Sequence, residues 1–317
     1  MKLTKEKTRS VVKIVPYHVN RFLSCWEFWL LCLPAIVLLL IFNYWPMFGS
    51  ILAFKDFNYQ DGILGSDWAG LNNFRFFFLS RDAWRITRNT IGYALIKLIL
   101  GTVLKITLAL LMYQITSKKL LKTYQTIFIL PHFMSWVIVS YITYVLLSGE
   151  YGVLNQIIRF FGGKGVSWYT EPKYWPFILP IVDQWKTIGM GSLMYYATLV
   201  GMDDSIFEAA AIDGAGKWKQ ITAIILPSLV PMITIMTILE IGNIFRGEFG
   251  LFYQIPRDSG ALYAATDVID TYVFRTMRSG DVGVSSAVGL FQSLVGFVMV
   301  ILTNYVVKKI EPDNAMF

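Results

Sequence analysis

The stretch Glu208-Ala209-Ala210-Ala211-Ile212-Asp213-Gly214-Ala215-Gly216 lies between two long apolar segments and runs on to Ile224-Ile225-Leu226-Pro227. Its alanines favour a helix. Gly214 and Gly216 end that helix, because glycine accepts the left-handed turn of a helix C-terminus. A second helix is expected to begin near Lys217 and to run into the next apolar segment. The sequence therefore predicts a helix, a sharp turn and a helix, outside the bilayer and joined rigidly to two membrane spans.

Side chains at both ends of this stretch support the same structure. Ser205 can cap the first helix, and Glu208 follows three residues later, which is the spacing of a reciprocal capping box. Pro227 and Pro231 are expected to bend the second helix, because proline lacks the amide hydrogen of the helical ladder.

The composition indicates an integral membrane protein. Of 317 residues, 55% are apolar and 16% aromatic, while only 15% are charged, against about 25% in soluble domains. The mean hydropathy is +0.53. The net charge of +7 could indicate nucleic-acid binding, but the basic residues flank apolar segments, as topology signals do. We therefore expect membrane lipid as a partner and no nucleic acid.

Cysteine and histidine offer no framework. Cys25 and Cys32 are seven residues apart on one predicted helix, a rise of about 10 Å, which is too far for a disulfide. His18 and His132 are far apart and have no carboxylates at metal-ligand spacing. We expect no metal site.

The chain is predicted to be an all-α membrane protein with six transmembrane helices. The domain from residue 26 to 310 would contain a loop at 201–220, between a basic arm (1–25) and a short tail (311–317). Lysines gather at both ends and in the loops after the second and fourth spans, so both termini and the 201–220 loop are expected in the cytoplasm. The six predicted spans are Phe28–Trp45, Ile86–Tyr113, Thr123–Leu147, Phe177–Val200, Ile221–Phe245 and Val282–Val307.

The organising stretch resembles the loop shared by integral membrane subunits of binding-protein-dependent ABC importers. That pattern is Glu-Ala-Ala, three residues, Gly, nine residues, Ile, one residue, Leu-Pro. Its positions are met by Glu208, Ala209, Ala210, Gly214, Ile224, Leu226 and Pro227. The Asp213-Gly214-Ala215 version is similar to the carbohydrate-uptake, maltose-type branch. An ordinary cytoplasmic helical hairpin is the alternative.

The resemblance implies a type I ABC importer permease in the bacterial plasma membrane. Its implied partners are a second homologous permease, two ATP-binding subunits, an extracytoplasmic solute-binding protein and an oligosaccharide. The chain itself would hold no cofactor, and ATP and Mg²⁺ would bind to the partner ATPase. The helix would act as a coupling helix in a groove of that ATPase. The coupling residues implied are Ser205, Glu208, Ala209, Ala210, Asp213, Gly214, Leu226 and Pro227.

Two further segments narrow the resemblance. Gly242 to Phe245, running on to Phe249–Tyr253, and Ala287 to Ser293 in the last span resemble oligosaccharide permeases related to those for uronate-containing sugars. An importer for another solute, such as a peptide or phosphate, is an alternative, as is an ATP-independent secondary transporter or channel. The sequence contains no phosphate-binding loop of its own and no nucleophile with a base, so we expect no enzymatic activity.

Polar residues inside the predicted spans are the candidates for the solute path, because charges within a membrane are costly and tend to face a cavity. They are Asp183, Gln184, Trp185, Lys186, Glu240, Asn243 and Arg246. The alternative is internal pairing, of Asp183 with Lys186, and of Glu240 with Arg246 or a lysine of a neighbouring span.

Charges near the span ends are assigned separately. We expect Lys97 and Lys105 to extend to the membrane interface, with a place in the path as the alternative. A solvated outer face is expected for Asp267, Asp270, Arg275 and Arg278.

Overall fold

A computed structural model describes residues 26–310 and residue 312, so the predicted basic arm (1–25) and most of the tail (311–317) lie outside the described residues. The chain divides into two compact units, one ending at Ile51 and the other beginning at Leu52. Each unit is described by itself.

The first unit is a single apolar helical segment. It comprises α2 (Trp26–Leu39), a π-helical turn η1 (Leu40–Tyr44) and the first part of a 3-10 helix η2 (Trp45–Phe54). The side chains of α2 are exposed over its whole length. The segment Trp26–Phe54 is long and apolar enough to cross a membrane, which agrees with the predicted first span.

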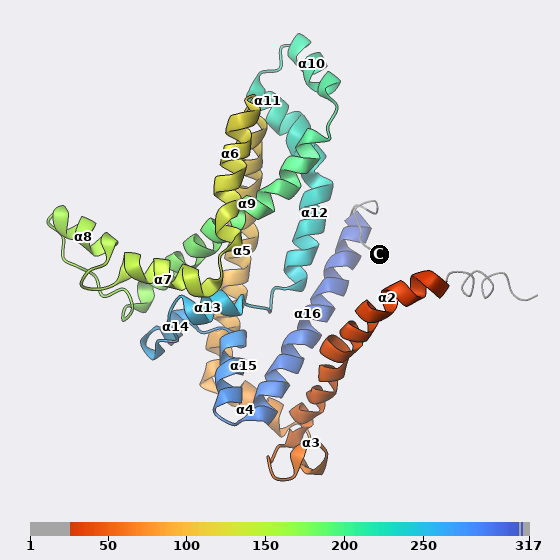
Figure 1. Cartoon of the computed structure of the whole chain (residues 1–317), viewed down its shortest axis with the longest axis vertical. Coiled ribbons are helices and arrows are strands. Elements are labelled where there is room, and N and C mark those ends of the chain that lie inside the picture. Colours follow the sequence, from red (N-terminus) through yellow and green to blue (C-terminus); the bar gives the residue numbers. More distant parts are fainter. Residues whose placement is uncertain (1–25, 311, 313–317) are drawn as a thin grey trace, which may run out of the picture. The chain divides into compact units, whose positions relative to one another are not determined.

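The second unit is almost entirely helical (Figure 1). Two short strands, β1 (Lys55–Asp56) and β2 (Asp67–Trp68), pair antiparallel. The helices are α3 (Gly62–Gly65), α4 (Asn72–Leu79), α5 (Arg81–Tyr113), α6 (Lys118–Ile129), η3 (Leu130–Phe133), α7 (Trp136–Leu147), α8 (Val153–Phe160), η4 (Pro172–Tyr174), α9 (Trp175–Val200), α10 (Asp204–Ile212), α11 (Lys217–Gln220), η5 (Ile221–Ile225), α12 (Leu226–Gly242), α13 (Phe249–Gln254), η6 (Gly260–Leu262), α14 (Tyr263–Thr266), α15 (Ile269–Arg278) and α16 (Val282–Ile310).

Four helices of the described chain are long and apolar enough to cross a membrane, or five if one bent pair forms a single span. Besides Trp26–Phe54 they are Arg81–Tyr113, Lys217–Gly242 and Val282–Lys309. The predicted fourth span forms the 26-residue helix α9. It is not among the apolar candidates, because its interior carries the polar residues predicted for the solute path.

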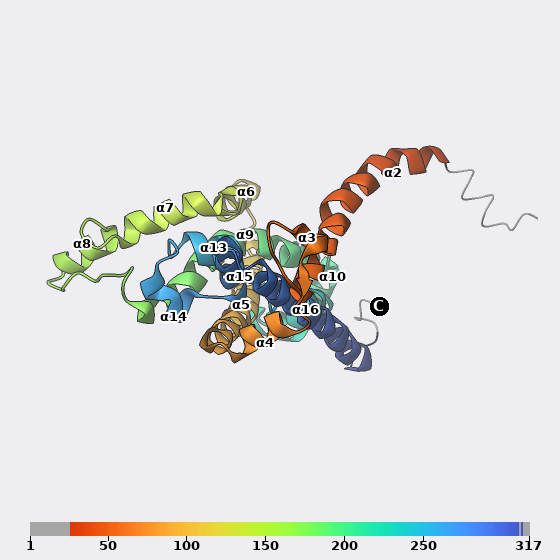
Figure 2. The same cartoon turned by 90° about the horizontal axis from the view of Figure 1, so that it is seen from below.

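The predicted third span is bent rather than continuous. Lys118–Phe133 and Trp136–Leu147 meet at 100°. Pro131 lies in η3 at the break, and Met134 and Ser135 are extended. The Ser135 hydroxyl caps α7 by accepting the Ile138 amide. Proline, an extended pair and a new cap together end one helix and start another. As a result, α7 and α8 extend to one side of α5 and α9 (Figure 2).

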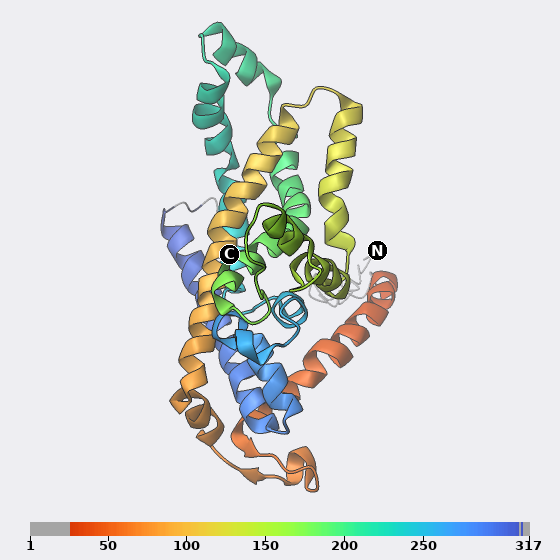
Figure 3. The same cartoon turned by 90° about the vertical axis from the view of Figure 1, so that its left-hand side faces the viewer.

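The core lies where α5, α6, α9 and α12 meet. Figure 3 shows α5 running from α4 to the loop before α6. Near its C-terminal end, Ala109 packs with Tyr195, Leu199, Ile225 and Leu229 in one buried cluster. The crossing of α6 and α9 requires a glycine, because a Cβ atom at Gly189 would overlap the Phe128 carbonyl.

Candidate functional site

The first helix of the predicted hairpin is α10, and its cap differs from the prediction. The Asp203 carboxylate accepts the Ser205 amide at 2.9 Å, so Asp203 is the cap and Ser205 lies inside the helix. This hydrogen bond holds the pKa of Asp203 below its ordinary value. The capping-box assignment to Ser205 and Glu208 was wrong by two residues, because Asp203, Asp204 and Ser205 can all cap a helix and Asp203 has the extended backbone that a cap needs.

The predicted glycine turn is confirmed. Gly214 has φ of +76°. Its amide donates to the Ala211 carbonyl at 3.0 Å, and the Ala215 amide donates to the Ala210 carbonyl at 2.9 Å, which is the paired hydrogen bonding of a Schellman motif. Asp213 is the C-cap residue. The second helix restarts at α11 and continues through η5 into α12, where Leu226 and Pro227 form the first turn.

The hairpin carries exposed apolar side chains at one end of the second unit (Figure 1). Ile212 is 87% exposed and Trp218 is 76% exposed, and Glu208 and Ala209 beside them are also exposed. Inward contacts are few: the ring of Phe207 lies 6.2 Å from that of Tyr113 at the end of α5. An exposed, rigid hairpin with apolar tips is typical of a docking surface.

The second unit also contains a cavity of about 540 Å³ between α5, α9, α12 and α13. It brings together five of the seven residues predicted for the solute path, namely Asp183, Gln184, Glu240, Asn243 and Arg246. Trp185 and Lys186 do not line it. Trp185 is exposed on another face of α9, and Lys186 donates to the His132 carbonyl at 2.8 Å and lies over the Trp136 ring.

Two lysines of α5 enter this cavity and meet carboxylates there. Lys105 Nζ lies 2.7 Å from Glu240 Oε1, and Lys97 Nζ lies 3.9 Å from Asp183 Oδ1. The expectation that these lysines extend to the interface is replaced by the alternative, since both line the cavity. Pairing of Glu240 with a lysine of a neighbouring span is confirmed, whereas pairing of Asp183 with Lys186 is not observed.

Several buried polar atoms facing this cavity have no hydrogen-bond partner among the described residues. They are Asp183 Oδ1, Gln184 Oε1, Glu240 Oε2 and His132 Nδ1. Three of them are oxygens that can only accept. Buried polar groups are normally hydrogen-bonded, so these atoms fit a ligand that supplies several donors.

Sequence reasoning missed part of the cavity lining. The rings of Tyr93 and Phe252 are 4.9 Å apart at its wall, and Glu248 accepts the Trp136 indole N–H at 2.9 Å. The spacing of Lys97 and Lys105, eight residues apart on one helix, places them on one face. That periodicity was the signal available for the lysines; the aromatic residues gave none.

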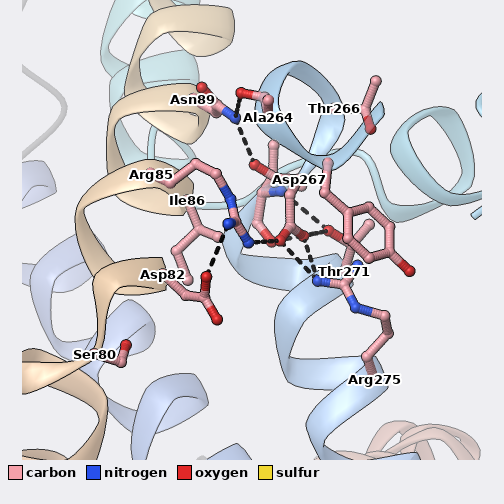
Figure 4. A network of polar contacts seen from close by, with 12 residues as sticks. Ser80, Asp82, Arg85, Ile86, Asn89, Ala264, Thr266, Asp267, Thr271 and Arg275 are labelled. Carbon is pink, nitrogen blue, oxygen red and sulfur yellow. Dashed lines mark hydrogen bonds and ion pairs between the residues drawn. The ribbon is translucent and has the colours of Figure 1, made fainter. Parts of the chain in front are cut away.

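The cavity wall is fixed by a buried cluster of charges around Asp267 (Figure 4). The Asp267 carboxylate is fully buried and accepts from Arg85 at 2.9 Å and from Arg275 at 2.7 Å. Thr271 donates to it as well, at 2.8 Å. The next residue, Val268, lines the cavity.

This cluster corrects the prediction of a solvated outer face. Asp267 and Arg275 pair across the start of α15, and Arg85 reaches them from α5, 182 residues away in sequence. Asp270 accepts from the Gly247 amide and from Gln292; burial raises its pKa, opposed by these hydrogen bonds. Only Arg278 of the predicted group is exposed. The pattern of the segment is amphipathic, and its polar face turns inward because α5 supplies the opposite charge.

Comparison with known proteins supplies a family. Residues 98–312 match the family described as "Binding-protein-dependent transport system inner membrane component". The chain is 34% identical over 289 residues to the polygalacturonan/rhamnogalacturonan transport system permease protein YteP of Bacillus subtilis, covering 90% of this chain and 89% of YteP. Protein LplB of Bacillus subtilis is 33% identical over 287 residues and 90% of each chain.

Solved structures agree. A crystal structure of a bacterial ABC transporter involved in the import of the acidic polysaccharide alginate matches with a TM-score of 0.84 and 31% identity, over 92% of this chain and 99% of that chain. The alginate transporter in complex with a pentasaccharide-bound periplasmic protein matches with a TM-score of 0.83 and 30% identity, over 94% of this chain and 98% of that chain.

Proposed function

The chain belongs to the family of binding-protein-dependent transport system inner membrane components, and we propose that it carries an oligosaccharide through the cavity between α5, α9, α12 and α13. As a member it is a multi-pass permease of the inner membrane and not the catalytic subunit. The proposal adds the cargo, the path and the coupling. The carbohydrate relatives and the alginate transporter support the cargo.

The single observation that carries the cargo is the set of unpaired acceptors. Asp183, Gln184 and Glu240 each leave one buried oxygen without a donor, in a cavity that also has aromatic rings in its wall. A sugar supplies several hydroxyl donors and flat apolar ring faces. A peptide or phosphate supplies fewer donors for three acceptor oxygens, and phosphate would meet two carboxylates.

The coupling proposal concerns α10. We place the hairpin in the cytoplasm, with α10 seated in a groove of an ATP-binding partner, where Glu208 makes a charged contact and ATP and Mg²⁺ are bound by the partner. A second permease and an extracytoplasmic binding protein complete the importer. In this arrangement six spans, including α9 and the bent pair, cross the membrane and both termini are cytoplasmic.

The connection from hairpin to cavity is direct. The hairpin continues through η5 into α12, which carries Glu240, and Phe207 holds it against the end of α5, which carries Lys105. A rigid-body shift of α10 therefore changes the relation between α12 and α5. The two carry the ion pair in the cavity, so ATP-driven movement of the partner would switch the cavity between two states.

The test uses the complete importer reconstituted in proteoliposomes, with radiolabelled oligogalacturonides and neutral gluco-oligosaccharides as probes. Replacing Asp183→Asn turns one acceptor into a donor, and uptake should fall by about tenfold, the effect of one unsatisfied buried hydrogen bond. Trp185→Phe is the matched control, because its neighbouring position does not line the cavity, and uptake should be unchanged. Failure of the unaltered importer to take up either series, or equal uptake by Asp183→Asn, would refute the proposed path.

A further inference from the structure

A second, smaller pocket of about 210 Å³ shares the helix α13 with the cavity. Leu251 and Phe252 of this helix line the cavity, while the next two residues, Tyr253 and Gln254, line the second pocket. α13 is thus a common wall. We call this pocket the outer tyrosine pocket; the lining residues that matter here are Tyr141, Tyr144, Tyr253, Gln254, Arg257 and Asp258.

The backbone at this pocket is costly. Arg257 has φ of +59° and Asp258 has φ of +48°, and among the described residues no other non-glycine residue has positive φ. Such a conformation costs about 1–3 kcal/mol for each residue and tends to occur at functional sites. Here it places two opposite charges in succession on the lining of one pocket.

The side chains are arranged as an aromatic platform with a polar edge. The Arg257 guanidinium lies 4.3 Å above the centre of the Tyr144 ring. No hydrogen bond from this guanidinium is found within residues 26–310, so its N–H edge is available. Asp258 is held by the Tyr263 hydroxyl at 2.9 Å and faces Arg275 at 3.7 Å.

This combination suits a sugar. Tyrosine rings offer flat apolar faces with a polar tip, and a stacked guanidinium presents a fork of donors to hydroxyl or carboxylate oxygens. Charged groups at the mouth also disfavour an acyl chain as the occupant, because burying them against hydrocarbon would be costly.

We infer that the outer tyrosine pocket is a second sugar-binding subsite, which holds one unit of an oligosaccharide whose other units occupy the cavity beyond α13. The inference rests on the proposed function. It has a consequence that the cavity alone does not: only a chain long enough to reach both sides of α13 gains from the pocket, so the pocket discriminates by length.

The test is Arg257→Asn in the complete importer. Asparagine tolerates positive φ better than most residues, so the substitution removes the guanidinium and keeps the turn. Uptake of galacturonate oligomers, from disaccharide to hexasaccharide, is measured with the same binding protein throughout. We expect hexasaccharide uptake to fall by about tenfold, the effect of one lost charged hydrogen-bonding group, while disaccharide uptake stays within about twofold. Lys164→Asn, which removes an exposed cation that lines neither pocket, is the control and should behave as the unaltered protein.

The outcomes separate the two proposals. Equal loss at every length would overturn the subsite and indicate a role in binding-protein docking or folding, as would uptake unchanged at every length. Absence of uptake of any oligomer by the unaltered importer would instead remove the proposed function, and the subsite with it. A second variant, Tyr141→Ala, deletes an exposed platform ring and should reproduce the length-dependent loss.

Discussion

The hairpin around α10 and the cavity are built in opposite ways. The hairpin is shaped by contacts within a few residues: Asp203 with Ser205, and Ala210 and Ala211 with the glycine turn. The cavity is shaped by partners far apart in sequence, such as Lys105 and Glu240, which are 135 residues apart. A surface that must dock can be encoded locally, whereas a charged cavity inside a helical bundle depends on which helices meet.

The largest effect is expected where long-range charge pairing is broken outright. Asp267→Asn leaves Arg85 and Arg275 without their shared carboxylate, and we expect destabilisation of about 4 kcal/mol, as for other broken buried pairs. Thermal unfolding of the purified protein measures it. Glu171→Gln is the control, because Glu171 pairs only with the exposed Lys173 and surface pairs contribute little. Equal shifts for both variants would show that the wall of the cavity does not depend on the buried cluster.

The ion pair within the cavity should give the next largest effect. Lys105→Met leaves Glu240 uncompensated, at an expected cost of about 3 kcal/mol. The double variant with Glu240→Gln should recover part of this loss, because no charge is then left alone. A double-mutant cycle on unfolding measures the coupling. Additive losses would mean that the two residues act separately, which would remove the long-range half of the comparison.

The sequence predicted the hairpin far better than the cavity, for a physical reason. Gly214 and the alanines specify their turn through their own backbone preferences, so the resemblance and the propensities agreed. For Asp183 and Glu240 the sequence gave polarity and depth, which suffices to predict that they face a cavity, but not that Lys97 and Lys105 are their partners.

Two errors have the same origin. Asp267 was expected in solvent because its segment is polar, and its burial depends on Arg85 in a distant helix. The third span was expected to be continuous because its composition is apolar, although Pro131 and Ser135 mark the bend. In the first case no local signal exists; in the second the signal is present, but apolar composition outweighed it.

Gly214→Val tests whether the hairpin's geometry matters for coupling. A Cβ atom at Gly214 meets nothing within 4 Å, so the cost comes from φ of +76° alone, about 2 kcal/mol. We expect the turn to change, uptake to fall and ATP hydrolysis by the partner to continue. The assay compares uptake with hydrolysis in proteoliposomes.

Gly216→Ala is the matched control for this turn. Gly216 has φ of −65° and open space around it, so alanine should leave uptake unchanged. Normal uptake by Gly214→Val, in protein shown to be in the membrane, would contradict the lever. Equal loss in both variants would mean that any added side chain obstructs docking, and that the turn itself is not the determinant.

The smallest effect is expected at the helix cap, where it also decides how local the hairpin is. Asp203→Ala removes the acceptor for the Ser205 amide, so hydrogen exchange should speed up in the first turn of α10, whereas Asp203→Asn keeps an acceptor and should exchange as the unaltered protein does. Because the pKa of Asp203 is lowered in the folded helix, its contribution is present above the unfolded-state pKa and is lost as the pH falls through the folded value. The difference in exchange between the unaltered protein and Asp203→Asn should therefore appear only in acid. If Asp203→Ala instead loosened the whole stretch from residue 204 to 216, the two ends of the hairpin would be coupled, and the contrast between a locally encoded docking element and a cavity encoded at long range would fail.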